Sequence, residues 1–396
     1  MELAQKLSLL AEYGFVLDEA QWHANAGRTV VVGMSGGVDS SVAALLVQLQ
    51  GYRTVGLFMK NWEETDATGQ CTSEADWKDV RRVGEQLGIP VFAVNFAEQY
   101  RALVFDGFLR DYRAGLTPNP DILCNREIKF KVFADYARVL GGDFLATGHY
   151  CRVEQTSAGP VLKKGVDAGK DQTYFLHAVA GAALANVLFP VGDLPKRRVR
   201  ELATRFGLAT QAKKDSTGVC FIGERDFKAF LSQYIEGQRG DFVDLRGHKL
   251  GAHDGACFYT IGQRKGLGVG GPGGPWFVAR KDHGDNRVVL VEGEHHAALY
   301  CGGLIARDPV WVGAAPTFPL RAKAKVRYRQ QDQDCVVEEV SGQLRVTFDV
   351  PQRAVTAGQS VVFYDGDVCL GGAVISEPGP SHLELGLAVA GIGEGV

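Results

Sequence analysis

The sequence predicts an α/β protein that begins with a doubly wound parallel sheet and ends in an all-β region. Strand-like and helix-like segments alternate from about residue 29 to residue 150, which is typical of a parallel sheet covered by helices. From about Trp276 the pattern changes to short strands separated by turns, which indicates a barrel or a sandwich. A chain of 396 residues is long enough for two or three domains.

Composition narrows the class of protein. An apolar content of 45% and a charged content of 22% are those of a globular protein, and no apolar run is long enough to span a membrane. The net charge of −3 means that any nucleic-acid surface has to be a local patch. The eight cysteines include no C-x-x-C pair, which favours a cytoplasmic protein with reduced thiols over a zinc framework.

The first 27 residues are expected to form one extra helix. They contain more acidic than basic residues, which is unlike a secretory signal or a transit peptide.

Residues 30–47 (VVVGMSGGVDSSVAALLV) carry the clearest functional signal. A β-branched run ending at Gly33 predicts a buried strand, and the apolar run over residues 42–49 predicts a helix. Between them lies a glycine- and serine-rich turn at a helix N-terminus, where backbone N–H groups bind anions. No lysine follows the glycines and the spacing is not G-x-G-x-x-G, so two common nucleotide loops are excluded. A phosphate site is therefore expected, with a plain tight turn as the alternative.

The following elements complete the predicted sheet. Further strands are expected at 54–60, 90–96 and 143–147, and helices at 74–88, over most of 97–115 and at 125–140. Ligands bind such sheets at the carboxyl ends of the strands. Met59 and Gly148 lie at two of these ends, and core packing is the alternative for Met59.

Two cysteines lie in segments that suggest chemistry. Pro118 and Pro120 argue against a regular element before Cys124, and a helix is expected to open at Asn125. A thiol at a helix N-terminus has a lowered pKa and is more nucleophilic, although a lone intracellular cysteine is often structural. Cys220 follows two lysines at residues 213–214, and nearby cations favour a thiolate.

Two basic segments stand out later in the chain. KRRVR at residues 196–200 forms a basic cluster on an expected helix, for which a solvated face is the default interpretation. In RAKAKVRYR at residues 321–329 every second residue is basic, so a strand would carry all five cations on one face. Because like charges repel unless a polyanion offsets them, this strand is expected to contact nucleic acid.

Several motifs together resemble a known family. The turn S-G-G-x-D-S is similar to the PP-loop of ATP pyrophosphatases, which split ATP into AMP and pyrophosphate. With GLFMKNWEE, TPNPDILCN, ATGHY, KDQTYFL, KKDSTGVCFIGER, GQRKGLG and VRYRQ in the same order, the chain resembles the bacterial tRNA-specific 2-thiouridylases from about residue 29 to residue 376.

The resemblance implies ATP- and Mg²⁺-dependent replacement of the C2 oxygen of a wobble uridine by sulfur. It implies Cys124 as nucleophile, Cys220 as persulfide carrier and Asp121 in proton transfer, with Asp39 as a candidate Mg²⁺ ligand. The residues it implies for ATP are Gly33, Met34, Ser35, Gly36, Gly37, Val38, Asp39, Ser40, Met59 and Gly148. Those it implies for tRNA are Asn119, Pro120, Asp121, Lys170, Asp171, Gln172, Arg327 and Tyr328.

The resemblance also implies a domain order and partners. A helical extension (1–28) would precede a PP-loop domain (29–222), a small central domain (223–296) and a C-terminal β-barrel (297–396). The partners would be tRNA and a sulfur-donor protein, either a cysteine desulfurase or a relay protein. Two alternatives stay open: another adenylating PP-loop ligase, for which no glutaminase-like motif is seen, and a non-catalytic module that binds ATP and tRNA.

Overall fold

The computed structural model describes residues 1–62, 72–215, 227–270, 273–282 and 284–389. By its contacts the chain divides into two compact units. The first contains Met1–Val104, Asp121–Glu224 and Asp367–Cys369, and the second contains Phe105–Pro120, Arg225–Gly366 and Leu370–Val396. No helix within the described ranges is long and apolar enough to cross a membrane.

The first unit is built on a parallel sheet in the order β3-β2-β1-β4-β7. The chain adds strands on one side of β1 and then crosses to the other, so β1 and β4 flank the point where strand order reverses. This confirms the predicted doubly wound sheet. The strands are β1 (Thr29–Met34), β2 (Arg53–Lys60), β3 (Val91–Asn95), β4 (Phe144–Thr147) and β7 (Val187–Leu188).

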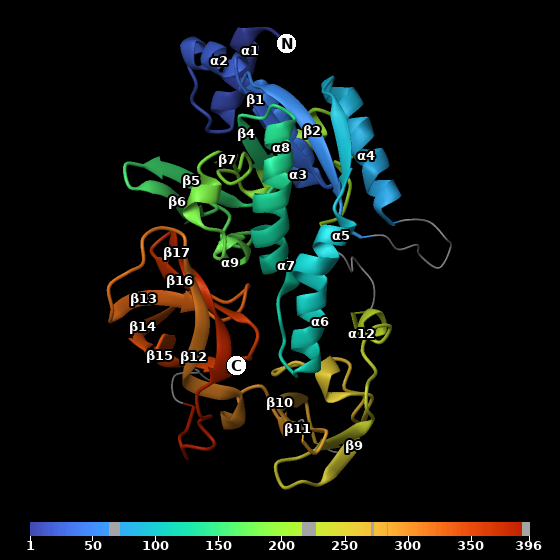
Figure 1. The fold of residues 1–396 in the computed structure, drawn as a ribbon, viewed down its shortest axis with the longest axis vertical. Helices are drawn as coiled ribbons and strands as arrows, with labels where there is room; N and C mark the ends of the chain where they lie inside the picture. The colour runs from blue at the N-terminus through green and yellow to red at the C-terminus, as the bar shows by residue number, and fades with distance from the viewer. Residues whose placement is uncertain (63–71, 216–226, 271–272, 283, 390–396) are drawn as a thin grey trace. The chain divides into compact units, whose positions relative to one another are not determined.

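Helix α3 (Val38–Leu49) is the centre of this unit's core. It is buried along almost its whole length, because it packs against β1 and against α11 (Lys196–Arg205). Figure 1 shows α3 beside the sheet. The other helices are α1 (Leu3–Glu12), α2 (Glu19–Ala26), α4 (Thr72–Leu87), α5 (Ala97–Tyr100), α8 (Phe133–Val139), α9 (Thr173–Leu176) and α10 (Gly181–Leu184), and a hairpin of β5 (Cys151–Thr156) and β6 (Gly159–Lys164) follows β4.

Two expectations about helices are wrong. The N-terminal segment forms two helices, because Asp18 caps α2 by accepting a hydrogen bond from the Gln21 backbone N–H. The helix expected from Asn125 begins at Pro120, with α7 (Pro120–Leu123) and the π-helical η2 (Cys124–Val132) leading into α8. Proline is favoured at the first position of a helix, since its missing N–H has no partner to lose there.

The second unit contains a sheet in the order β10-β11-β8-β9, with helices beside it. Its core includes Phe242, Val278, Leu290 and Leu267, the last from the glycine-rich segment after β9. The elements are η1 (Arg101–Phe105), which crosses the boundary, α6 (Asp106–Arg113), α12 (Phe227–Leu231), β8 (Gly240–Val243), β9 (Lys249–His253), η3 (Ala256–Phe258), β10 (Trp276–Asp282), β11 (Arg287–Glu292) and η4 (Ala297–Leu299).

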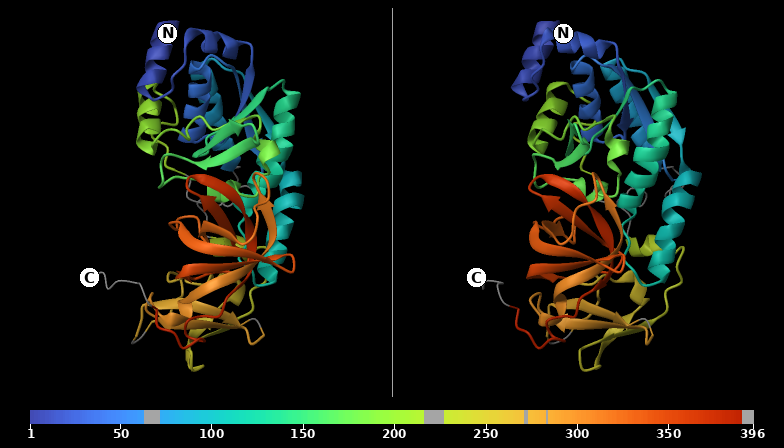
Figure 2. Two further views of the ribbon diagram at one scale, coloured as in Figure 1. Left: turned by 90° about the vertical axis from the view of Figure 1, so that its left-hand side faces the viewer. Right: turned by 60° about the vertical axis from the view of Figure 1, so that its left-hand side comes forward.

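The C-terminal strands form a closed barrel. They pair in the order β12-β15-β14-β13-β16-β17, and β12 also pairs with β17, which closes the cylinder around a shared interior (Figure 2). This decides between the barrel and the sandwich. The strands are β12 (Tyr300–Trp311), β13 (Leu320–Lys325), β14 (Gln333–Val340), β15 (Gln343–Arg353), β16 (Ser360–Asp365) and β17 (Val368–Pro378).

Candidate active site

The predicted phosphate loop lies between β1 and α3, at the carboxyl edge of the sheet. Gly37 is the N-cap residue of α3, and the helix begins at Val38. The Ser40 hydroxyl accepts a hydrogen bond from the Ser35 backbone N–H and donates one to the Gly37 carbonyl oxygen. These bonds hold the loop at the positive end of the helix dipole, which favours a bound anion.

Two glycines are required by close packing at this loop. Gly36 has a φ of +76°, and a Cβ there would lie 2.8 Å from the Asp76 carbonyl oxygen. Gly148 follows β4, and a Cβ there would lie 2.7 Å from the Ser40 backbone nitrogen. The structure therefore brings Gly148 onto the first turn of α3. Gly33, Met34 and Met59 lie at the ends of the adjacent strands β1 and β2.

Asp39, in the first turn of α3, is the centre of a charged network. Lys196 Nζ lies 2.6 Å from Asp39 Oδ1 and 2.8 Å from Oδ2. The Tyr150 hydroxyl donates to Asp39 Oδ1 over 2.7 Å. Burial and the neighbouring Asp39 charge raise the pKa of Tyr150, so this hydroxyl stays a donor.

Asp215 extends the network. Its carboxylate lies 2.9 Å from Lys196 Nζ, 2.7 Å from Lys170 Nζ and 2.6 Å from Arg200 Nη2. Burial alone would raise the pKa of Asp215, but hydrogen bonds from Lys170 and Lys196 hold that pKa well below its usual range. Three cations and two carboxylates thus gather beside the phosphate loop.

Sequence reasoning missed most of this network. Lys196 and Arg200 belong to the basic cluster that was interpreted as a solvated helix face, yet the Lys196 side chain is only 12% exposed. Lys196 is separated from Asp39 by 157 residues, so no local pattern relates them. One signal could have drawn attention to Lys196: it opens its helix directly after a proline.

The predicted tRNA contact at residues 170–172 belongs partly to the same network. Lys170 is paired with Asp215, and the Gln172 side-chain oxygen accepts from the Tyr150 backbone N–H over 2.9 Å. Asp171 is buried and accepts hydrogen bonds from Thr173. In this structure, Gln172 supports the segment that carries Tyr150, and Asp171 binds the backbone of Gly165 and Thr173.

Cys124 does not lie in a loop as expected. It is fully buried inside the helical run from Pro120, four residues after its start, while Asp121 is half-buried in the first turn. The ring of Phe130, in the same run, packs on the His149 ring, with 5.8 Å between the two ring centres. Burial holds the pKa of His149 well below its usual value, so its imidazole is neutral beside Gly148. Cys220 lies outside the described residues.

The strand predicted over residues 321–329 is shorter than expected, because β13 ends at Lys325; the predicted contact with nucleic acid stays a prediction. Over β13, acidic side chains of β14, of β15 and of the following turn offset the charges. Arg321 forms a two-pronged pair with Asp349 on β15. Lys323 lies 3.7 Å from Asp334 and Lys325 lies 3.6 Å from Asp332. No outside polyanion is needed to relieve repulsion among these three cations.

Arg327 and Tyr328 follow the end of β13. Arg327 Nη2 donates to the carbonyl oxygens of Ile261 and Ala354 and to the Thr356 hydroxyl, at 2.8 Å, 2.8 Å and 3.1 Å. Arg327 therefore joins the barrel to the central part of the second unit. Asn119 and Pro120 also belong to the second unit.

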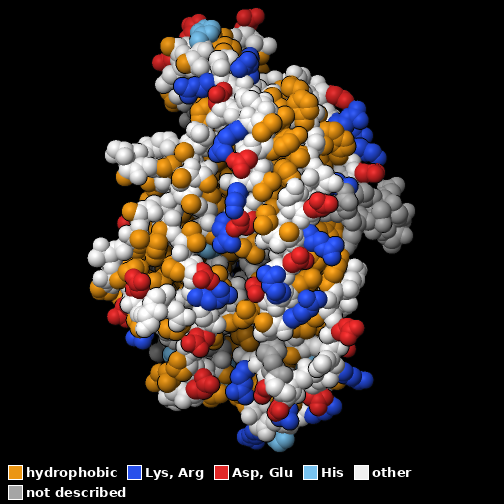
Figure 3. All heavy atoms as spheres, viewed as in Figure 1, with side chains coloured by type: hydrophobic (Ala, Val, Ile, Leu, Met, Phe, Trp, Pro, Cys, Tyr) orange, Lys and Arg blue, Asp and Glu red, His pale blue; other side chains and the backbone are white. Residues whose placement is uncertain are grey.

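The surface agrees with these pairings. The face drawn in Figure 3 shows Lys and Arg side chains intermixed with Asp and Glu side chains rather than gathered in one basic patch.

The described residues contain no group of three or more His, Cys, Asp or Glu side chains that could hold a metal ion. Mg²⁺ characteristically binds one or two carboxylates together with substrate phosphates, and Asp39 is a carboxylate at the loop that fits this role.

Comparisons with known proteins agree over most of the chain. Models described as the tRNA methyl transferase HUP domain, PRC-barrel domain and aminomethyltransferase β-barrel domain match residues 28–224, 228–292 and 301–375. The tRNA-specific 2-thiouridylase MnmA of Protochlamydia amoebophila is 57% identical over 359 residues, 90% of this chain and 96% of that protein. The enzymes of the same name from Marinomonas sp. and Alkaliphilus oremlandii are 53% and 54% identical, over 89% and 88% of this chain and 92% and 97% of their own.

Proposed function

The chain belongs to the tRNA-specific 2-thiouridylase family and is an ATP-using tRNA uridine sulfurtransferase, and on that premise we propose how its residues divide the reaction. The C2 oxygen of the wobble uridine attacks the α-phosphorus of ATP and pyrophosphate leaves. The observation that carries this proposal is the ion pair beside the serine–glycine loop, between Asp39 on the first turn of α3 and Lys196 at the start of α11.

The loop and the network have distinct tasks in the adenylation step. The backbone N–H groups at the N-terminus of α3 bind the phosphates of ATP, and they do so without reorganising. Lys196, with Asp39 as its partner in the structure, supplies a positive charge where pyrophosphate develops negative charge. Mg²⁺ held by Asp39 and the substrate phosphates would neutralise further charge there.

Sulfur transfer follows in two steps. The terminal sulfur of a Cys220 persulfide attacks C2, and AMP leaves with the former C2 oxygen, so the base is joined to Cys220 through the new sulfur. The Cys124 thiolate then attacks Cys220 Sγ, which forms a Cys124–Cys220 disulfide and leaves sulfur on C2. A thiol reductant regenerates both cysteines, and Asp121 exchanges a proton with the base.

This proposal requires Cys124 to become accessible during turnover. Its side chain is buried here, within a π-helical stretch in which Phe130 departs from helical geometry with φ −100° and ψ 16°. Such π-helical insertions are frequent at functional sites. We propose that the flipped-out wobble base opens this stretch when tRNA binds.

The reaction also needs contacts with tRNA, a sulfur donor and a reducing compartment. Asn119, Pro120 and Asp121 would contact the target base, and Lys170, Arg327 and Tyr328 the tRNA. A cysteine desulfurase or a relay protein would load the persulfide. The cytoplasm, where thiols stay reduced, is the compartment that suits this chemistry.

The experiment compares Cys124→Ser and Cys220→Ser with Cys257→Ser, a half-buried cysteine of the second unit. Each of the first two variants should abolish formation of 2-thiouridine, measured by nucleoside mass spectrometry, while tRNA-dependent pyrophosphate release continues. Cys257→Ser should retain both activities. Formation of ADP and phosphate by the unaltered protein would overturn the adenylation step, and thiolation by either of the first two variants would overturn the two-cysteine step.

A further inference from the structure

The N-terminal helices α1 and α2 contact both helices that form the ATP site. These helices precede the region matched by the HUP-domain model, which begins at residue 28. We propose that residues 1–27 form an internal brace that holds α11 against α3 and thereby keeps Lys196 at Asp39. This inference rests on the proposed role of the phosphate loop in binding ATP.

Helix α2 binds the end of α3 that is remote from the loop. Trp22 Nε1 donates to the Leu49 carbonyl oxygen over 2.9 Å, and Asn25 Nδ2 donates to the Gln50 carbonyl oxygen over the same distance. The last carbonyl groups of a helix have no partner within the helix, so these two side chains serve as its C-terminal cap. At Gly51 a Cβ would lie 2.7 Å from the Trp22 carbonyl oxygen, which shows how closely α2 packs here.

Helix α1 joins the core between α3 and α11. Leu9, Leu10 and Tyr13 are almost fully buried in the cluster that contains Val42 of α3 and Leu202 of α11. Burial of a large apolar side chain contributes about 1.5–3 kcal/mol. Residues of the extension therefore share one apolar core with α3 and α11.

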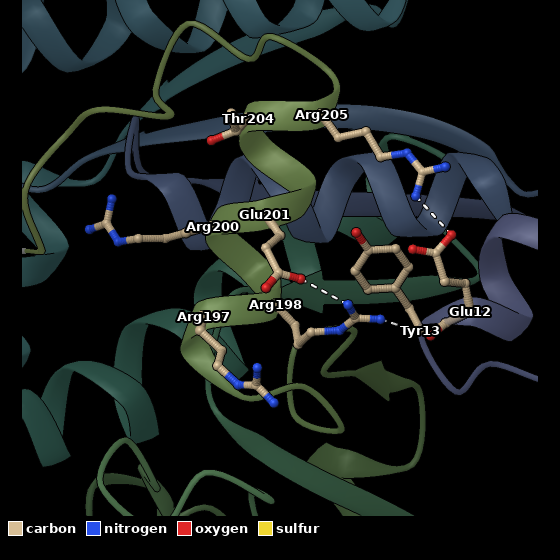
Figure 4. A pocket seen from close by; sticks show the side chains of 8 residues that line it. All are labelled: Glu12, Tyr13, Arg197, Arg198, Arg200, Glu201, Thr204 and Arg205. Atoms are coloured by element: carbon tan, nitrogen blue, oxygen red, sulfur yellow. Dashed lines mark hydrogen bonds and ion pairs between the residues drawn. The ribbon is translucent and has the colours of Figure 1, made fainter.

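Polar contacts fix α11 to the end of α1 (Figure 4). Arg198 Nη2 donates to the Glu12 carbonyl oxygen over 2.8 Å, and its guanidinium lies 4.1 Å from the centre of the Tyr13 ring. Arg205 Nη1 donates to Glu12 Oε2 over 2.8 Å. Cations at a helix C-terminus are also favoured by the helix dipole. The neighbouring Arg197 lines the same pocket, but no dashed line joins it to Glu12 or Tyr13 in Figure 4.

The position of α11 determines the position of Lys196. Lys196 is the first residue of α11, two residues before Arg198, and its side chain reaches back to Asp39 on the first turn of α3. A shift of α11 by an ångström or more would lengthen these bonds beyond hydrogen-bond range. Arg198 and the extension thus act on ATP through Lys196 and are positioning residues.

The test uses Arg198→Met, which keeps the apolar stem but removes the hydrogen bond to Glu12 and the ion pair with Glu201 of the same helix, and Arg197→Met as the control on that helix. ATP affinity is measured calorimetrically with Mg²⁺ in the full-length protein, together with amide hydrogen exchange of residues 193–205. Arg198→Met should bind ATP about fivefold more weakly and exchange faster over the first turn of α11. Arg197→Met should match the unaltered protein in both measurements.

A double-mutant cycle shows whether the effect passes through Lys196. Lys196→Gln should weaken ATP binding by about tenfold or more, and adding Arg198→Met should weaken it no further. Additive losses, or unchanged exchange in Arg198→Met, would overturn the brace even if ATP binds normally. Failure of the unaltered protein to bind ATP would instead overturn the proposed function, since the exchange result does not depend on ATP.

Discussion

Two of the regions where cations meet carboxylates in the described residues are organised differently. Beside the phosphate loop, Lys196 pairs with both Asp39 and Asp215, and Lys170 and Arg200 pair with Asp215 as well. On β13 of the barrel, Arg321, Lys323 and Lys325 each lie beside a different acid, from β15, from β14 and from the turn after β13 respectively.

The difference shows why a shared network of charges suits a phosphate-binding site better than separate ion pairs do. Shared, half-buried charges form a network whose members each depend on the others, and an incoming polyphosphate can displace a carboxylate from a lysine there. The exposed pairs of Arg321 with Asp349 and of Lys323 with Asp334 are expected to be weak and largely independent. The regular pattern in sequence thus lies in the barrel, and the irregular arrangement lies in the proposed site.

The largest effect is expected from Asp39→Asn, compared with Asp349→Asn on β15. Loss of the Asp39 charge removes the partner of Lys196 and a candidate Mg²⁺ ligand, so tRNA-dependent pyrophosphate release should fall about 100-fold. Asp349→Asn breaks a barrel pair with Arg321 and should leave that rate unchanged. Equal losses in the two variants, measured as pyrophosphate released per enzyme, would remove the distinction between the regions.

A smaller effect, on stability, is expected from Arg327→Met. The change leaves the carbonyl oxygens of Ile261 and Ala354 without this donor, which costs about 1–3 kcal/mol of unfolding free energy. Thermal unfolding by calorimetry should show the loss, whereas Arg329→Met, at an exposed neighbour, should not. An unchanged unfolding temperature together with weaker tRNA binding would mean that Arg327 binds tRNA and does not stabilise the fold.

The smallest effect is expected from Lys323→Gln on β13. Its pair with Asp334 is exposed and 3.7 Å long, so the free energy of unfolding should change by less than about 0.5 kcal/mol. The slope of tRNA affinity against salt should change by less than about one unit, since one unit corresponds to one phosphate contact. A larger change in filter-binding titrations would restore a nucleic-acid role to this strand.

Much of the fold follows from local patterns. The run of valines at 30–32, the glycine–serine turn and the apolar helix after it predict a strand, a phosphate loop and α3, because each element's period is written in adjacent residues. The alternation of elements predicts the doubly wound sheet for the same reason. The PP-loop motifs likewise identify the family.

Tertiary structure alone decided the rest. Sequence patterns place Cys124 before a helix, but Pro120 starts that helix earlier and the cysteine is buried within it. Period two places the cations of β13 on one face, but only strand pairing supplies the acids that offset them. Lys196 meets Asp39 across 157 residues, because the sheet and α1 bring α11 onto α3. Contacts between distant segments depend on packing, which no local period records.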